Sequence, residues 1–130
     1  MDTREKILPW QEAMGRFERQ LAGALPLRIV TGYFDPVLAV HARALEEMAD
    51  SDGRPAVIIT DPPDPLLPAE ARAVLVAALA AVEWVTLAPA SGLAELLERI
   101  PRTRLVRAEA EHLAIRADFM RRVRARHSVA

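Results

Sequence analysis

The feature that most constrains the fold of this chain is a series of short apolar runs that alternate with helical patterns. The clearest run is AVIIT, residues 56–60, whose β-branched side chains are typical of a strand buried on both faces. Similar runs occupy residues 27–31, 83–87 and 103–107. Strands separated by helices form βαβ units. The sequence therefore predicts an α/β fold, a three-layer Rossmann-like sandwich with a parallel sheet.

The segments between these runs have the patterns of helices and turns. The third of the expected helices is predicted to carry Ala71, Leu75, Leu79 and Val82 on one stripe. This alanine-rich helix could face the core or another subunit. The proline-rich segment 61–68 is expected to be neither helix nor strand interior. The predicted helices are 10–21, 39–49, a helix that begins near Pro68, 93–99 and 109–126.

Length and composition restrict the classes of protein that need to be considered. The 130 residues predict a single domain, residues 1–130, and the hydrophobic content of 52% is that of a globular protein. The absence of cysteine excludes disulfides, thiolate metal sites and cysteine nucleophiles. The histidines, His41, His112 and His127, do not have the spacing of metal ligands, so we expect no metal site in the protein itself.

The sequence offers no targeting or membrane signal. Residues 1–14 are charged and lack the apolar core of a signal peptide. No apolar run approaches the roughly 18 residues that a membrane span requires. We therefore expect a cytoplasmic protein with no membrane partner.

Charge is distributed unevenly along the chain. The segment 112–130 carries five arginines against Asp118, which gives it a net charge of about +4, whereas the rest of the chain is about −5. A basic C-terminal helix could contact phosphate-bearing ligands. It could equally be a solvated helix face with favourable cations in its last turns.

The turn after the first predicted strand is the main candidate for a binding site. In open α/β sheets, ligands bind at the carboxyl ends of strands, where the chain order reverses. Here the strand 27–31 is followed by Gly32-Tyr33-Phe34-Asp35-Pro36 and then by a helix, whose first N–H groups can bind anions.

Residues 31–41, TGYFDPVLAVH, resemble the G-x-F-D-x-x-H-x-G-H signature of the cytidylyltransferase-like nucleotidyltransferases. Within that superfamily the closer likeness is to the adenylyltransferase domain of bacterial ADP-heptose synthesis. The likeness extends through EKILPWQEAMGRFERQL before the motif and through IITD, AALAAVEWV and LLERIPRTRLVR after it. It covers residues 5–112 in order and implies a bacterial protein with an HxGH-type nucleotidyltransferase fold.

The resemblance also implies a reaction and a set of site residues. In this family a sugar or polyol phosphate attacks the α-phosphorus of a nucleoside triphosphate, and pyrophosphate leaves. An active chain would use Mg²⁺ with the nucleotide and no other cofactor, with His41 as the catalytic residue that stabilises the phosphates. The nucleotide-binding residues implied by the resemblance are Gly32, Tyr33, Phe34, Asp35, His41, Asp61, Arg72 and Arg107.

The chain departs from the family pattern at the positions that contact phosphates. Leu38 replaces the first motif histidine, and Val40 replaces the motif glycine. The basic loop after the second strand is reduced to 62–72, and AEAE (108–111) replaces the glycines after the last strand. The serine/threonine stretch of the last helix becomes RADFMRRVRAR, 116–126. Loss of one transition-state donor commonly costs about 10²–10³ in rate, so these changes together argue against catalysis.

Several candidate residues also have a structural interpretation. His41 could pack at the edge of the core instead of contacting an anion. Asp35 and Asp61 could cap a helix or a loop, as aspartate often does. Arg72 could face solvent or form a salt bridge, and Gly32 could serve only the backbone turn.

Three functional hypotheses follow from the sequence. The leading one is a degenerate nucleotidyltransferase-like protein, inactive or much weakened, retained to bind a ligand or a protein. Its partners would be a nucleotide or phosphorylated small molecule, a second copy in a homodimer, or an active relative. The second is an active enzyme that transfers AMP or CMP to a small sugar or polyol phosphate. The third is a module that binds phosphate-rich ligands through its basic C-terminal helix; nucleic acid is not expected as a partner.

Overall fold

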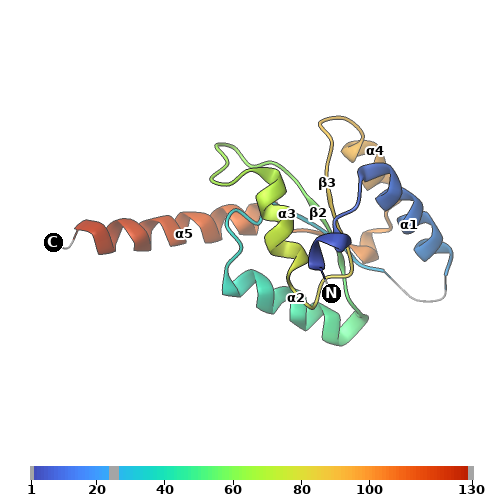
Figure 1. Cartoon of the computed structure of the whole chain (residues 1–130), viewed down its shortest axis with the longest axis horizontal. Coiled ribbons are helices and arrows are strands. Elements are labelled where there is room, and N and C mark those ends of the chain that lie inside the picture. The colour runs from blue at the N-terminus through green and yellow to red at the C-terminus, as the bar shows by residue number, and fades with distance from the viewer. Residues whose placement is uncertain (1, 24–26, 129–130) are drawn as a thin grey trace.

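The computed structural model describes residues 2–23 and 27–128, which form a three-layer α/β sandwich around an all-parallel sheet (Figure 1). Within this part of the chain, four strands pair in the order β3-β2-β1-β4. The Rossmann-like fold predicted from the alternating pattern is confirmed. The strands are β1 (Ile29–Gly32), β2 (Ala56–Ile59), β3 (Val85–Leu87) and β4 (Leu105–Arg107).

The helices cover both faces of the sheet. α2 and α3 pack on one face, and α1 and α4 pack on the other. The described residues also form two 3₁₀ helices, η1 (Thr3–Lys6) and η2 (Arg102–Arg104). The α-helices are α1 (Trp10–Ala22), α2 (Ala39–Asp52), α3 (Ala69–Ala77), α4 (Leu93–Arg99) and α5 (Glu109–Ser128).

Alternation along the strands divides the core into two clusters. In β2, Val57 and Ile59 face the cluster beneath α2 and α3, whereas Ala56 and Ile58 face the cluster beneath α1 and α4. All four residues of β2 are buried, as the β-branched run predicted. The buried indole of Trp84 belongs to the second cluster and donates a hydrogen bond from Nε1 to Gln20 (3.1 Å).

The third helix differs from its prediction. The predicted stripe through Ala71, Leu75, Leu79 and Val82 was wrong, because α3 ends at Ala77, before Leu79 and Val82. Leu75 is 44% exposed, whereas Val82 is buried. The buried face of α3 instead carries Arg72, Ala73, Val76 and Ala77. The physical reason is the guanidinium of Arg72, which finds hydrogen-bond acceptors at the strand ends and so turns this side of the helix inward.

Three of the strands begin two residues later than predicted, at Ile29, Val85 and Leu105. Before β4 the chain forms η2 directly after Pro101, and this tight turn occupies the residues expected to open the strand. The proline-rich segment 61–68 contains neither helix nor strand, in agreement with its composition.

α5 leaves the body of the protein. Its first turns lie over the sheet, and its C-terminal half extends away from the other elements (Figure 1). Among the described residues, no helix combines the length and the apolar character needed to span a membrane.

Candidate functional site

The topology places the candidate site between β1 and β4. The chain proceeds from β1 to β2 to β3 in one direction across the sheet, and it then returns to add β4 on the other side of β1. The carboxyl ends of β1 and β4 therefore form the point at which a ligand of an open α/β sheet would bind. In this protein α5 starts two residues after β4 and covers that point.

The backbone amides after β1 are occupied by a side chain from α5. The N–H groups of Tyr33 and Phe34 donate to Nδ1 of His112 at 3.1 and 3.3 Å. Phe34 has a φ of 49°, a left-handed conformation that helps to direct both amides to one acceptor. Gly32 makes room for the ring, because a Cβ at this position would lie 2.6 Å from Nδ1 of His112. An anion at these amides would have to displace the imidazole.

His41 lies beside His112 in the same buried cluster. The two rings meet edge to face with centroids 4.5 Å apart, and Phe34 contacts both rings. Nδ1 of His41 accepts a hydrogen bond from the N–H of Leu38 (2.9 Å), so the imidazole caps the start of its own helix. Nε2 of His41 is buried and has no hydrogen-bond partner among the described residues.

Burial disfavours the charged form of both imidazoles. Burial lowers the pKa of His41. Burial, and then the proximity of His41, lower the pKa of His112 to about 4, against an opposing effect of Glu109. A neutral His112 keeps the lone pair on Nδ1 that the amides of Tyr33 and Phe34 require.

Glu109 connects the ends of β1 and β2. Its carboxylate accepts hydrogen bonds from the hydroxyls of Thr31 (2.8 Å) and Thr60 (3.1 Å). Arg107 donates to Thr31 Oγ1 (2.8 Å) and pairs with Glu109 (3.2 Å). Burial alone would raise the pKa of Glu109, but the hydrogen bonds from Arg107 and Thr31 outweigh it and lower the pKa. The polar groups at these strand ends thus bind one another.

Asp35 organises the proline-rich loop. Its buried carboxylate accepts hydrogen bonds from the N–H groups of Leu66 (2.7 Å) and Leu67 (2.9 Å). Arg116 of α5 pairs with the same carboxylate (3.3 Å) and also donates to the carbonyl of Pro63 (3.0 Å). The aspartate therefore ties the loop, α5 and the turn after β1 together.

Arg72 is fully buried and holds the same loop and the turn after β1. Its guanidinium donates to the carbonyls of Tyr33 and Thr60, both at 2.9 Å, and to that of Leu67 at 3.1 Å. It also pairs with Asp61 (2.8 Å), whose side chain is 72% exposed. Of the two structural interpretations of Arg72, which were to face solvent or to form a salt bridge, the salt bridge is the one observed.

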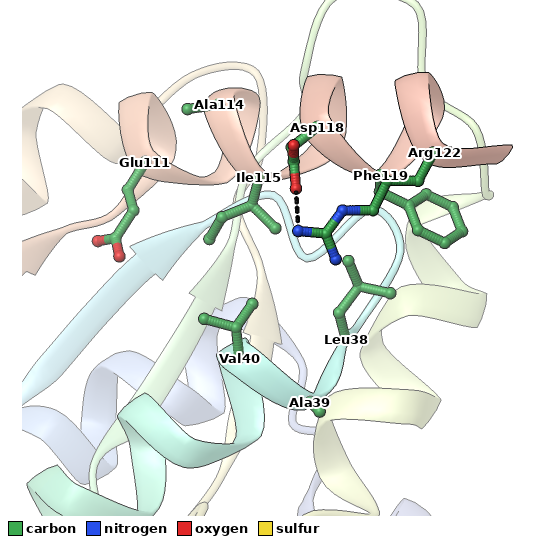
Figure 2. A pocket seen from close by; sticks show the side chains of 9 residues that line it. All are labelled: Leu38, Ala39, Val40, Glu111, Ala114, Ile115, Asp118, Phe119 and Arg122. Carbon is green, nitrogen blue, oxygen red and sulfur yellow. Dashed lines mark ion pairs between the residues drawn. The ribbon is translucent and has the colours of Figure 1, made fainter. Parts of the chain in front are cut away.

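An apolar groove lies between the start of α2 and the exposed side of α5. Its volume is about 580 Å³. Leu38, Ala39 and Val40 form one wall, and Val40 is 45% exposed. Ile115 and Phe119 form the other wall, and Figure 2 shows the two sets of apolar side chains facing each other. The polar groups at its margin are Glu111, Asp118 and Arg122, the last two in an ion pair of 3.1 Å.

The structure brings all of the sequence-predicted site residues to one end of the sheet, each with a partner inside the protein. Sequence reasoning missed three residues that organise this region: Glu109, His112 and Arg116. All three belong to the first turns of the last helix. A signal was available in the charged and histidine side chains that directly follow the last strand, once that strand is placed beside β1.

No model of a known protein family matches the chain, and no curated protein matches it either. The chemistry of the candidate site is therefore inferred from the contacts of its own residues. Among residues 2–23 and 27–128, no three histidine, aspartate or glutamate side chains are placed to hold a metal ion. What the arrangement offers is a closed polar framework at the strand ends and, next to it, an open apolar groove.

Proposed function

We propose that this protein is a degenerate nucleotidyltransferase-like protein that has lost catalysis and is retained for binding. The observation that carries the proposal is the apolar groove at the first turn of α2. The resemblance assigns phosphates to the positions of Leu38 and Val40, and there the chain presents aliphatic side chains that face Ile115 and Phe119. Charged phosphates placed against such a surface would lose hydration without gaining hydrogen bonds.

The state of the donors supports the same proposal. A nucleotidyl transfer needs N–H groups and cations that are free to stabilise charge on the phosphates. Here the amides of Tyr33 and Phe34 donate to His112. The guanidinium of Arg72 is shared among three carbonyls and Asp61. Rearranging these groups to bind a triphosphate would leave several buried carbonyls unpaired, which costs about 1–3 kcal/mol for each group.

The test is isothermal titration of the protein with ATP and with CTP, each in the presence of Mg²⁺. We expect no heat of binding with either nucleotide. Micromolar binding that is lost in His41→Ala, and kept in the exposed control Arg43→Ala, would show that the pocket still holds a nucleotide. Release of pyrophosphate from that nucleotide when sugar phosphates are added would then contradict the loss of catalysis and support the active enzyme.

A gain-of-function variant makes the test sharper. Leu38→His with Val40→Gly restores the two motif positions of the family. His112 still accepts the hydrogen bonds of the Tyr33 and Phe34 amides in this variant, so we expect no nucleotide binding. We expect weak nucleotide binding only when His112→Ala is added. The circular dichroism of each variant establishes that it is folded.

A further inference from the structure

α5 is much longer than its contact with the body requires. Its 20 residues correspond to about 30 Å of helix. Glu109, His112 and Arg116 hold its first two turns through the contacts described above. Figure 1 shows the rest of the helix running clear of the sheet. A short helical segment in water is only marginally stable unless an apolar face is covered.

The protruding part continues the apolar wall of the groove. Ile115, Phe119 and Val123 follow one another at intervals of four residues, so they lie on the same side of the helix. This side is the one that carries the buried His112 at the base of α5. Ile115 and Phe119 line the groove, and Val123 lies one turn further out. The apolar stripe therefore extends beyond the body that would cover it.

Charge indicates what kind of partner fits this surface. α5 begins with Glu109 and Glu111 and ends with basic residues. A partner helix with a basic end would therefore find Glu111, which lines the groove, at the body end of the groove. The arginines in the outer half of α5 are Arg121, Arg122, Arg124 and Arg126.

We propose that the groove binds α5 of a second copy of this chain, antiparallel to the first. Each copy gives its outer half-helix to the groove of the other, and the pair closes with two-fold symmetry. With Phe119 at the axis, Val123 of each copy lies against Ile115 and Val40 of the other. The basic end of each α5 then reaches the acidic start of the other helix.

This inference rests on the proposed function, because the groove can accept an apolar helix only if it does not hold phosphates. It goes further by naming the occupant and its register. The antiparallel arrangement satisfies both observations at once: it covers the stripe through Val123 and places opposite charges together. A parallel arrangement would place the arginines of the two helices side by side.

The first test is sedimentation velocity of the full chain across a concentration series. Val40→Arg places a cation where the basic end of the partner arrives, and Val123→Glu places a charge in the stripe. The matched control is Val74→Arg, since Val74 is 40% exposed on α3, away from the groove. We expect a dimer for the unmodified protein and the control, and a dimer weakened about tenfold or more in the two groove variants.

The second test uses the absence of cysteine from the chain. Equal amounts of the single variants Val40→Cys and Val123→Cys are mixed and oxidised. We expect a disulfide-linked heterodimer between them, and a homodimer of Phe119→Cys. Mixing Val74→Cys with Val123→Cys provides the control, for which we expect little cross-linking.

A protein that remains monomeric at high concentration would overturn the dimer. So would a dimer that Val74→Arg disrupts and the groove variants leave intact, which would place the interface on α3. Either result leaves the titrations with ATP and CTP unaffected, so failure of the dimer is distinguishable from failure of the non-catalytic assignment. Nucleotide binding that disperses the dimer would contradict the assignment of the groove as closed to phosphates, while the dimer formed without nucleotide would stand.

Discussion

The ring of His112 lies against Gly32 so closely that a Cβ at position 32 would come within 2.6 Å of its Nδ1. The contact joins the last helix to the central strand of the sheet. It also explains why glycine stands at the end of β1, since any larger residue would push the imidazole away from the amides of Tyr33 and Phe34.

Gly32→Ala is expected to destabilise the protein by about 2–3 kcal/mol, as overpacking of a buried site commonly does. The measurement is urea unfolding followed by circular dichroism. The double variant Gly32→Ala/His112→Ala should lose less than the sum of the single variants, because removal of the ring relieves the overlap. Additive losses would show that the close approach of the ring has no energetic consequence.

The free energy of unfolding is expected to decrease as the pH falls from about 6.5 to about 4. The pKa of His112 is about 4 in the folded protein and about 6.5 in an unfolded chain. In this window the unfolded state binds the proton and the folded state does not, so acid favours unfolding. The stabilisation is fully present above about pH 6.5, the pKa of histidine in the unfolded chain. The decrease in the free energy of unfolding amounts to about 3 kcal/mol. The lowered pKa of His41 acts in the same direction.

Denaturant unfolding at a series of pH values measures this dependence. His112→Gln removes the titrating group, so its unfolding free energy should vary less between about pH 5 and 6.5. The exposed His127 provides the control, because His127→Gln should keep the slope of the unmodified protein. An equal slope in His112→Gln would contradict the role given to this histidine.

Arg72→Met is expected to destabilise the protein by about 3 kcal/mol or more. The change removes a buried guanidinium and leaves the carbonyls of Tyr33, Thr60 and Leu67 without their donor. Asp61→Ala should cost less than about 1 kcal/mol, because the side chain of Asp61 is 72% exposed. Thermal unfolding of both variants compares the two losses of stability. Equal losses would mean that the ion pair with Asp61, and not the hydrogen bonds to the carbonyls, accounts for the stabilisation by Arg72.

Asp35→Asn is expected to loosen the proline-rich loop. The amide side chain offers only one acceptor oxygen where the carboxylate serves both Leu66 and Leu67, and it cannot pair with Arg116. Hydrogen exchange of the Leu66 and Leu67 amides should become about tenfold faster or more. The conservative control is Asp64→Asn, a change at an exposed position of the same loop that should leave these exchange rates unaltered.

The fold followed from local patterns. The strand at 56–60 could be predicted locally, because its β-branched residues suit a buried strand and the flanking prolines and glycine stop a helix. The alternation of strands with helices then required parallel pairing. These features depend on residues close together in the sequence, and they are the ones that were predicted correctly.

The contacts of the site were less accessible to prediction. The position of His112 depends on β4 lying beside β1, and its hydrogen bond to Tyr33 joins residues 79 positions apart. Arg72 looked like a surface residue because arginine is seldom buried. Its burial depends on carbonyls that meet only after the strand ends, the turn after β1 and the proline-rich loop have come together.

The hydrogen bond between Tyr33 and His112 has a consequence for biosynthesis. A ribosome delivers β1 and its turn before it delivers the first turns of α5, since Tyr33 and His112 are 79 positions apart. Until residue 112 emerges, the amides after β1 are open to water and to any small anion in the cell. Newly made chains thus pass through an interval in which the turn after β1 is exposed, and the last helix ends that interval.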